Sequence, residues 1–306
     1  MNRNRSTFVA GSFCVIMLLA FENSHSQEIY RDSLEIMIPD SSHVQILKLK
    51  DGSEIIGRTV EITESEIVFQ SNLGTSRVSK AEIQEIVVIE TKAARPGGYW
   101  FPNPNVTRLY FAPTGRLPKK GHGYFSTYYL FFPGITGAFS DRVSVGAGFS
   151  LFPGVGLERQ AFYVTPEIGL YQSERNNVAV GGIIASAPGW DIDDDDIPTF
   201  GALYAIGCYG PPDASLTGGL AFAFANDEFE ERPAILLGGQ GRLSRHVSFV
   251  SENWKFPGAD FVLMSYGLRF FGARMSFDLG FFSAWGNNTD MFFPGIPWVD
   301  FVYNFQ

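Results

Sequence analysis

The sequence predicts an all-β protein, in which a transmembrane antiparallel up-and-down β-barrel of about 12 strands follows a small β-barrel domain of about five strands. Three observations support this prediction. The chain is rich in Gly, Phe and Tyr (33, 29 and 12 residues), and only 18% of its residues are charged. Apolar and polar side chains alternate with a period of two in many segments, which is typical of strands. After residue 26, no apolar run is long enough for a membrane-spanning helix.

The clearest predicted hairpin covers residues 260–282. Each of its two strands carries one apolar row, which consists of Val262, Met264, Tyr266, Leu268 and Phe270 in the first strand and of Met275, Phe277, Leu279 and Phe281 in the second. The opposite face carries small, polar and charged residues, among them Ser265, Arg269, Ser276 and Asp278. A tilted strand needs about 9–11 residues to cross a hydrocarbon layer. The hairpin therefore predicts lipid on its apolar face and a polar lumen on the other.

Residues 1–26 are predicted to be an export signal. Arg3 and Arg5 precede an apolar stretch at residues 8–21, and Ser24 and Ser26 are small residues at the cleavage positions. A membrane-anchor helix is the alternative, although the apolar stretch is short for a span of about 20 residues. Removal of the signal leaves Cys208 as a single cysteine, which excludes an internal disulfide.

Residues 27–42 are predicted to be a connector, and residues 43–92 a small β domain with strands at 44–50, 54–61, 66–71, 75–79 and 83–90. Asp51-Gly52 is a strong hairpin signal. Leu49-Lys50-Asp51-Gly52, Gly57-Arg58 and Leu73-Gly74 resemble the pattern of a small SH3-like or Sm-like barrel, which implies a five-stranded fold. Two roles are expected for this domain, either docking of a periplasmic protein or service as a structural spacer.

Nucleic acid is not an expected partner, although Sm-like domains often bind RNA. The net charge of the chain is -9, and acidic residues outnumber basic ones within residues 40–92. Binding to phosphates needs a basic footprint. This segment also lacks an aromatic platform on which bases could stack.

Residues 93–105 contain Pro96, Gly97 and Gly98, which break strands, and are predicted to be a linker. Residues 106–306 are predicted to form the barrel. Its connections alternate between short turns and longer, more acidic loops, which is the asymmetry expected for periplasmic turns and external loops. The predicted strands cover residues 106–113, 121–132, 142–152, 160–171, 176–187, 199–208, 215–225, 233–242, 246–255, 260–270, 273–283 and 296–305.

This part of the chain resembles bacterial outer-membrane β-barrel proteins, a group that includes porin-like solute channels, a phospholipase and autotransporter translocation units. Residues 298–305 are similar to the aromatic closing strand that the barrel-assembly machinery recognises, although Gln306 follows the last aromatic residue. The resemblance implies an outer-membrane location, contact with outer-membrane lipid and insertion by that machinery. It carries no activity with it.

A soluble β-sandwich or a lipocalin-like barrel is the structural alternative, because its strands alternate as well. Such a fold places apolar side chains inside and Lys and Glu outside. Here the faces opposite the aromatic rows carry Gly, Ser, Thr and scattered single charges. This pattern favours lipid outside and a polar interior.

Six charged residues are predicted to point into the lumen, namely Glu167, Arg242, Glu252, Arg269, Asp278 and Asp300. In a pore, they would tune the selectivity for charged or polar solutes. The alternative is an internal salt-bridge network that fills the lumen. The sequence leaves both open, because the choice depends on the cross-strand register.

One acidic segment is a candidate metal site, since hard cations such as calcium bind several carboxylate oxygens. Its residues are Asp191, Asp193, Asp194, Asp195 and Asp196. The spacing differs from that of the Asp-x-Asp-x-Asp-Gly calcium loop, and a solvated loop is the simpler interpretation. Asp227, Glu228, Glu230 and Glu231 extend the same acidic rim.

His246 and Ser248, followed by Asn253, have the spacing of the catalytic residues in phospholipase-type barrels. Both side chains are expected near a periplasmic turn, whereas lipid hydrolysis needs them at the outer lipid face. We therefore expect no catalytic residues, and no cofactor.

Together these features predict an outer-membrane barrel that is a passive pore or a binding site for a small polar solute. An alternative from another class is a non-conducting envelope scaffold whose N-terminal domain docks a periplasmic partner. An outer-membrane hydrolase is the third hypothesis.

Overall fold

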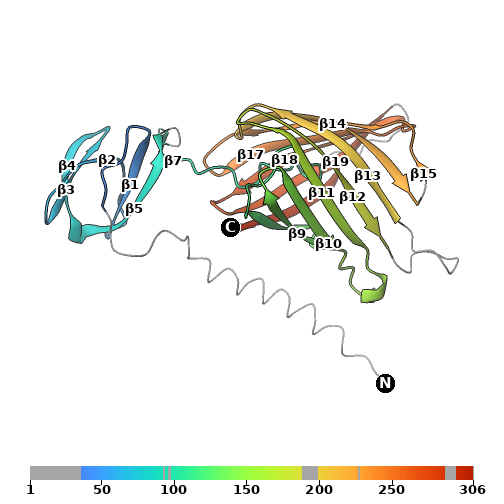
Figure 1. Cartoon of the computed structure of the whole chain (residues 1–306), viewed down its shortest axis with the longest axis horizontal. Helices are drawn as coiled ribbons and strands as arrows, with labels where there is room; N and C mark the ends of the chain where they lie inside the picture. The colour runs from blue at the N-terminus through green and yellow to red at the C-terminus, as the bar shows by residue number, and fades with distance from the viewer. Residues whose placement is uncertain are drawn as a thin grey trace, which may run out of the picture. The chain divides into compact units, whose positions relative to one another are not determined.

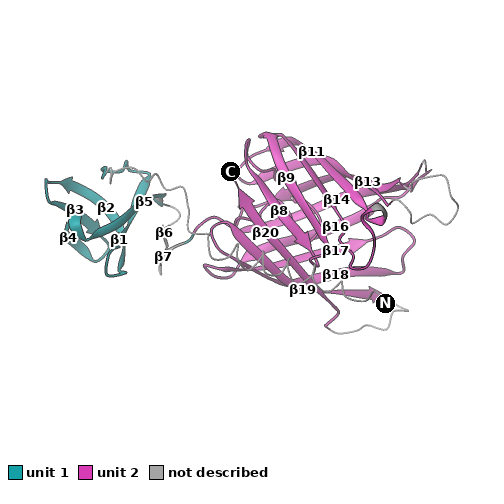
Figure 2. Ribbon diagram, turned by 90° about the horizontal axis from the view of Figure 1, so that it is seen from below, with its two compact units in different colours: residues 1–100 teal, residues 101–306 magenta. Residues whose placement is uncertain are grey.

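The computed structural model describes residues 36–91, 94–95, 98–187, 199–226, 228–286 and 294–305, so the predicted export signal lies outside the described residues. The chain divides into two compact units, Met1–Trp100 and Phe101–Gln306 (Figure 2). Strands dominate the described part, which also contains short 3-10 turns such as η1 (Lys80–Glu82) and η3 (Leu157–Arg159). None of the described helical segments is long and apolar enough to cross a membrane.

The first unit contains a five-stranded antiparallel sheet with the order β4-β3-β2-β1-β5. Leu47, Ile67 and Phe69 form its buried core. Gly52 in the first hairpin has a φ of 89°, a conformation that glycine adopts without steric cost. The predicted strands are confirmed to within one residue: β1 (His43–Leu49), β2 (Glu54–Ile62), β3 (Glu66–Ser71), β4 (Gly74–Ser79) and β5 (Ile83–Glu90). The likeness to an SH3-like or Sm-like barrel stays a prediction.

The second unit is a closed antiparallel barrel of 12 strands (Figure 1). Neighbouring strands pair in chain order, and the last strand closes the ring by pairing with the first. The strands are β8 (Gly123–Tyr128), β9 (Phe132–Ser140), β10 (Val143–Phe149), β11 (Phe162–Gln172), β12 (Asn176–Ser186), β13 (Thr199–Tyr209), β14 (Ala214–Ala225), β16 (Ala234–Arg242), β17 (Val247–Lys255), β18 (Phe261–Phe271), β19 (Met275–Gly286) and β20 (Ile296–Phe305). Two-residue strands β6 (Ala94–Arg95) and β7 (Gly98–Tyr99) precede the barrel, and β15 (Glu228–Phe229) pairs antiparallel with the end of β14.

The wall of the barrel has apolar side chains outside and polar side chains inside. In β19, Phe277 and Leu279 are 38% and 42% exposed, whereas Ser276 and Asp278 between them are buried. The same alternation recurs around the ring, for example with exposed Leu237 in β16 and buried Gln240. This arrangement is the reverse of a soluble sandwich or lipocalin-like barrel, so that alternative is wrong.

The count of 12 strands is confirmed, but one predicted strand is not part of the wall, and one wall strand, β9, was not predicted. Residues 106–113 are not a wall strand and lie inside the barrel. Residues 121–132, predicted as one strand, end at Tyr128, and β9 follows after a turn in which Tyr129 and Leu130 have positive φ. The sequence Phe132-Pro133-Gly134 at the start of β9 contains two strand breakers, which hid this strand.

The two ends of the barrel differ in their connections. At one end, which we call the short-turn end, the strands are joined by residues 141–142, 173–175, 210–213, 243–246 and 272–274. The other end, the long-loop end, carries mostly longer connections, such as residues 150–161, 187–198 and 287–295. Because Gly123 of β8 pairs with Phe305 of β20, the chain enters and leaves the wall at the short-turn end.

Candidate functional site: an occupied lumen and its pocket

Residues 101–119, which we call the inner segment, lie inside the barrel. The segment enters at the short-turn end, where the Phe101 ring packs on His246 with 5.2 Å between ring centroids. Halfway into the lumen it turns back, and the Leu109 N–H donates to the Ala112 carbonyl at 2.8 Å. It returns to the short-turn end, where the Arg116 guanidinium donates to the carbonyls of Glu174 and Gly210. Asn103 and Asn105, which belong to the linker predicted at residues 93–105, are buried in the lumen.

The tip of the inner segment is held by one carboxylate, that of Glu252 in β17. Its Oε2 accepts the backbone N–H groups of Tyr110, Phe111 and Ala112 at 2.9, 2.9 and 3.0 Å. Its Oε1 accepts the indole N–H of Trp254 at 2.7 Å. Hydrogen bonds to an ionised acceptor are among the strong ones, so Glu252 fixes the position of the tip.

Arg269 in β18 is fully buried and holds the ingoing arm of the inner segment, before its turn. It donates to the backbone carbonyls of Asn105, Arg108 and Leu109, and to Gln240 Oε1 at 3.2 Å. Its guanidinium also pairs with Asp278, the residue directly opposite in β19. Every side of this guanidinium therefore meets an acceptor, which is what a buried charge requires.

A second buried pair connects the inner segment to the wall. Arg108 pairs with Asp300 of β20, and its guanidinium carbon lies 4.6 Å from the centroid of the Tyr128 ring. At the short-turn end, Arg242 donates to the Phe101 carbonyl at 2.9 Å and pairs with Asp213 at 3.0 Å.

Five of the six charged residues predicted to face the lumen thus take part in holding the inner segment. Arg242, Glu252 and Arg269 contact it directly, Asp300 pairs with its Arg108, and Asp278 supports Arg269. A role in pore selectivity stays a prediction. Arg108, the partner of Asp300 on the inner segment, was missed because residues 106–113 are rich in residues that favour strands and were predicted as a wall strand.

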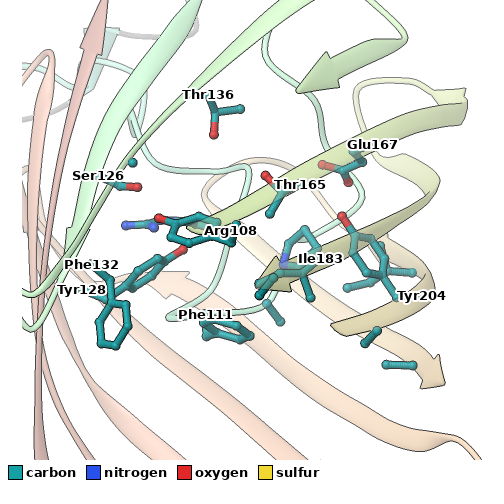
Figure 3. A pocket seen from close by; sticks show the side chains of 18 of the residues that line it. Arg108, Phe111, Ser126, Tyr128, Phe132, Thr136, Thr165, Glu167, Ile183 and Tyr204 are labelled. Carbon is teal, nitrogen blue, oxygen red and sulfur yellow. The ribbon is translucent and has the colours of Figure 1, made fainter. Parts of the chain in front are cut away.

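Between the tip of the inner segment and the long-loop end lies a cavity of about 440 Å³ (Figure 3). Most of its wall is aromatic or aliphatic. Residues at the loop-side ends of the strands, including Tyr129, Phe132 and Phe200, line it, so the cavity reaches the long-loop end. Figure 3 shows Arg108 and Tyr128 on one side of the cavity and Thr165, Glu167 and Tyr204 on another.

Glycines in the wall make room for the tyrosine rings of the pocket. Gly181 of β12 stands between Glu167 of β11 and Tyr204 of β13 in the cross-strand register. A Cβ at Gly181 would lie 2.5 Å from the Tyr204 hydroxyl, so the ring lies across the glycine toward Glu167. Gly134 and Gly148 make the same space for Tyr163. The rings of Tyr204 and Tyr163 therefore lie close against glycines of the wall.

Glu167, the sixth predicted luminal charge, faces this cavity. Its Oε1 is shielded from solvent and has no hydrogen-bond partner among the described residues. Its neighbours in register, Ser144 and Gly181, are small. Because the Glu167 side chain lines the cavity and its carboxyl group has an unused acceptor, it can accept a hydrogen bond from a bound molecule.

The residues of the hydrolase hypothesis are not brought together. His246 lies in a turn at the short-turn end, where its Nδ1 is 3.1 Å from the Phe271 carbonyl oxygen. Ser248 is buried in the lumen wall, and the Asn253 amide donates to the Leu237 carbonyl and to Ser251 Oγ. Asn253 and Ser248 are separated by an odd number of positions along β17, so they face opposite sides of the wall.

The candidate metal site lies outside the described residues, which exclude Asp191, Asp193, Asp194, Asp195 and Asp196. Asp227 of the acidic rim lies outside them as well. Within the described part of the chain, no group of three or more His, Cys, Asp or Glu side chains is arranged to hold a metal ion.

No protein-family model matches the chain. No curated protein sequence matches it either. Among solved structures, it is similar to a loop-deletion mutant of OmpT, an outer membrane protein of Vibrio cholerae (12% identity, 86% of this chain, 96% of that chain, TM-score 0.35). It is also similar to Salmonella typhi OmpF (11%, 86% and 95%, TM-score 0.34) and to a Rhodopseudomonas blastica porin mutant (11%, 86% and 97%, TM-score 0.32). Similarities this low carry no functional argument, and the barrel is established by its own strand pairing.

Proposed function

We propose that this protein is an outer-membrane β-barrel that binds a small, largely apolar molecule in a pocket of its lumen. The apolar outer face supports the membrane location, because large side chains such as Phe139, Leu216 and Leu237 are exposed to 72%, 67% and 64%. In water such a surface is costly, whereas lipid accepts it. The short-turn end is then periplasmic, and the first unit, which precedes the inner segment in the chain, belongs to the periplasmic side.

The observation that carries the binding function is the cavity of about 440 Å³ beside the inner segment. Small-molecule sites are usually concave, mainly apolar and provided with a few polar groups, with volumes of about 300–1,000 Å³. The inner segment occupies the lumen from the short-turn end to its middle, where Leu109, Tyr110 and Thr114 are fully buried. This arrangement favours binding from the long-loop side over passive passage of solutes.

The binding of an apolar fluorescent dye such as N-phenyl-1-naphthylamine to the protein in lipid nanodiscs tests this function, with empty nanodiscs as the reference. Ala202→Trp fills the pocket from β13, since Ala202 lines it. The control Leu203→Trp adds the same ring to the next residue, whose side chain is 48% exposed on the outer face. We expect Ala202→Trp to weaken dye binding at least about tenfold and Leu203→Trp to leave it unchanged. Absence of saturable binding, or equal binding by both variants, contradicts the proposal.

A further inference from the structure

The pocket contains one acidic group that the protein does not neutralise. Its charged lining residues are Arg108 and Glu167. Arg108 is already paired with Asp300. Glu167 forms no ion pair with any described residue, and its Oε1 has no hydrogen-bond partner there. Burial of an uncompensated carboxylate is costly. A ligand with a positive charge near Glu167 should therefore bind more tightly than a neutral ligand of the same shape.

The walls around Glu167 also favour a cation. Tyr124, Tyr128, Tyr163 and Tyr204 line the pocket together with Trp254. The face of an aromatic ring attracts ammonium groups, most strongly where water is excluded. Tyr204 is the nearest of these rings in register, since its hydroxyl lies over Gly181, the direct neighbour of Glu167.

We propose that the ligand of this pocket is a small organic amine, whose ammonium group contacts Glu167 and Tyr204 and whose apolar body lies among the other rings. The inference rests on the proposed binding function and names the class of molecule. A carboxylate of the same size is disfavoured, because it meets Glu167 as a like charge. The charge of Arg108 is offset by Asp300 through Nη2, although its Nε and Nη1 have no hydrogen-bond partner among the described residues.

Three probes with the same apolar body test the proposal: 4-phenylbutylamine, 4-phenylbutanol and 4-phenylbutanoate. Their binding to the full-length protein in nanodiscs is measured by calorimetry and by the fluorescence of Trp254 and Trp298, which both line the pocket. We expect the amine to bind at least about tenfold more tightly than the alcohol, and the carboxylate to bind most weakly.

Glu167→Gln removes the charge and keeps the shape of the side chain. In this variant the amine should lose its advantage of about tenfold, while the affinity for the alcohol stays the same. Glu231→Gln removes an equal charge from an exposed loop residue and serves as the control, with no expected change.

The possible results separate the two proposals. Equal binding of amine and alcohol, or an unchanged preference in Glu167→Gln, overturns the amine assignment and leaves the binding function in place. If no probe binds, both proposals are overturned. A preference for the amine that Glu231→Gln abolishes also overturns the assignment, because it then arises from the charge of the loops.

Discussion

Arg269 and Asp278 stand directly opposite each other in β18 and β19, and two parallel hydrogen bonds of 2.7 Å join the guanidinium to the carboxylate inside the barrel. The pair also orients the rest of the Arg269 guanidinium. Its fixed geometry aims the remaining N–H groups of Arg269 at the carbonyls of Leu109 and Arg108. The wall of the barrel and the inner segment are thus connected through one buried side chain.

Replacement of Arg269 should destabilise the whole second unit. Arg269→Met leaves Asp278 buried without a partner, and such losses cost about 3–5 kcal/mol. The control is Arg232→Met, since Arg232 approaches Glu230 only to 3.9 Å on the surface, where a pair contributes about 0–1 kcal/mol. Urea unfolding in lipid vesicles measures both. Equal stability of the two variants would show that Arg269 does not hold the structure together.

Glu252 should control the mobility of the tip of the inner segment. Without its carboxylate, the N–H groups of residues 110–112 lose their acceptor, so Glu252→Ala should accelerate their hydrogen exchange by about 10–100-fold. Asn253→Ala changes the neighbouring residue, whose side chain bonds to Leu237 and Ser251 of the wall, and should leave this exchange unaltered. Slow exchange in Glu252→Ala would contradict the anchoring role.

Gly181 should be required for the shape of the pocket. The Cβ of Gly181→Ala meets the Tyr204 hydroxyl at 2.5 Å and the Pro166 carbonyl at 2.6 Å, so the ring has to move into the cavity at a cost of about 1–3 kcal/mol. Gly137→Ala in β9, where a Cβ has nothing within 4 Å, is the matched change. Dye binding should fall in the first variant alone. Unchanged binding in Gly181→Ala would place the ligand elsewhere.

A charged substitution on the outer face should destabilise the protein more strongly the deeper it lies in the lipid. Leu279 is 42% exposed near the middle of β19, and Leu243 is 63% exposed in a short turn. Leu279→Arg should reduce the free energy of folding into lipid vesicles by about 2–4 kcal/mol, and Leu243→Arg by about 0–1 kcal/mol. A similar small effect at both positions would argue against a membrane around this face.

The architecture of the wall could be predicted from the sequence. In segments such as residues 275–281, apolar and polar residues alternate because one face of the strand meets lipid and the other meets the lumen. The sequence was not sufficient for the inner segment. Residues 106–113 have the composition of a strand, and composition does not reveal whether a segment pairs with a neighbouring strand or lies in the lumen. The pairing of Arg269 with Asp278, and the row that joins Glu167, Gly181 and Tyr204, depend on cross-strand register. That register is set by the closure of the whole ring.

Ion conductance across a planar bilayer tests most directly whether the inner segment closes the lumen. The full-length protein should show no steady conductance. Because residues 101 and 119 lie at the same end of the barrel, a short Gly-Ser linker can replace residues 103–117, and this variant should form stable, long-lived open channels. Steady conductance of the full-length protein, equal to that of the variant, would contradict the closed lumen on which the account depends.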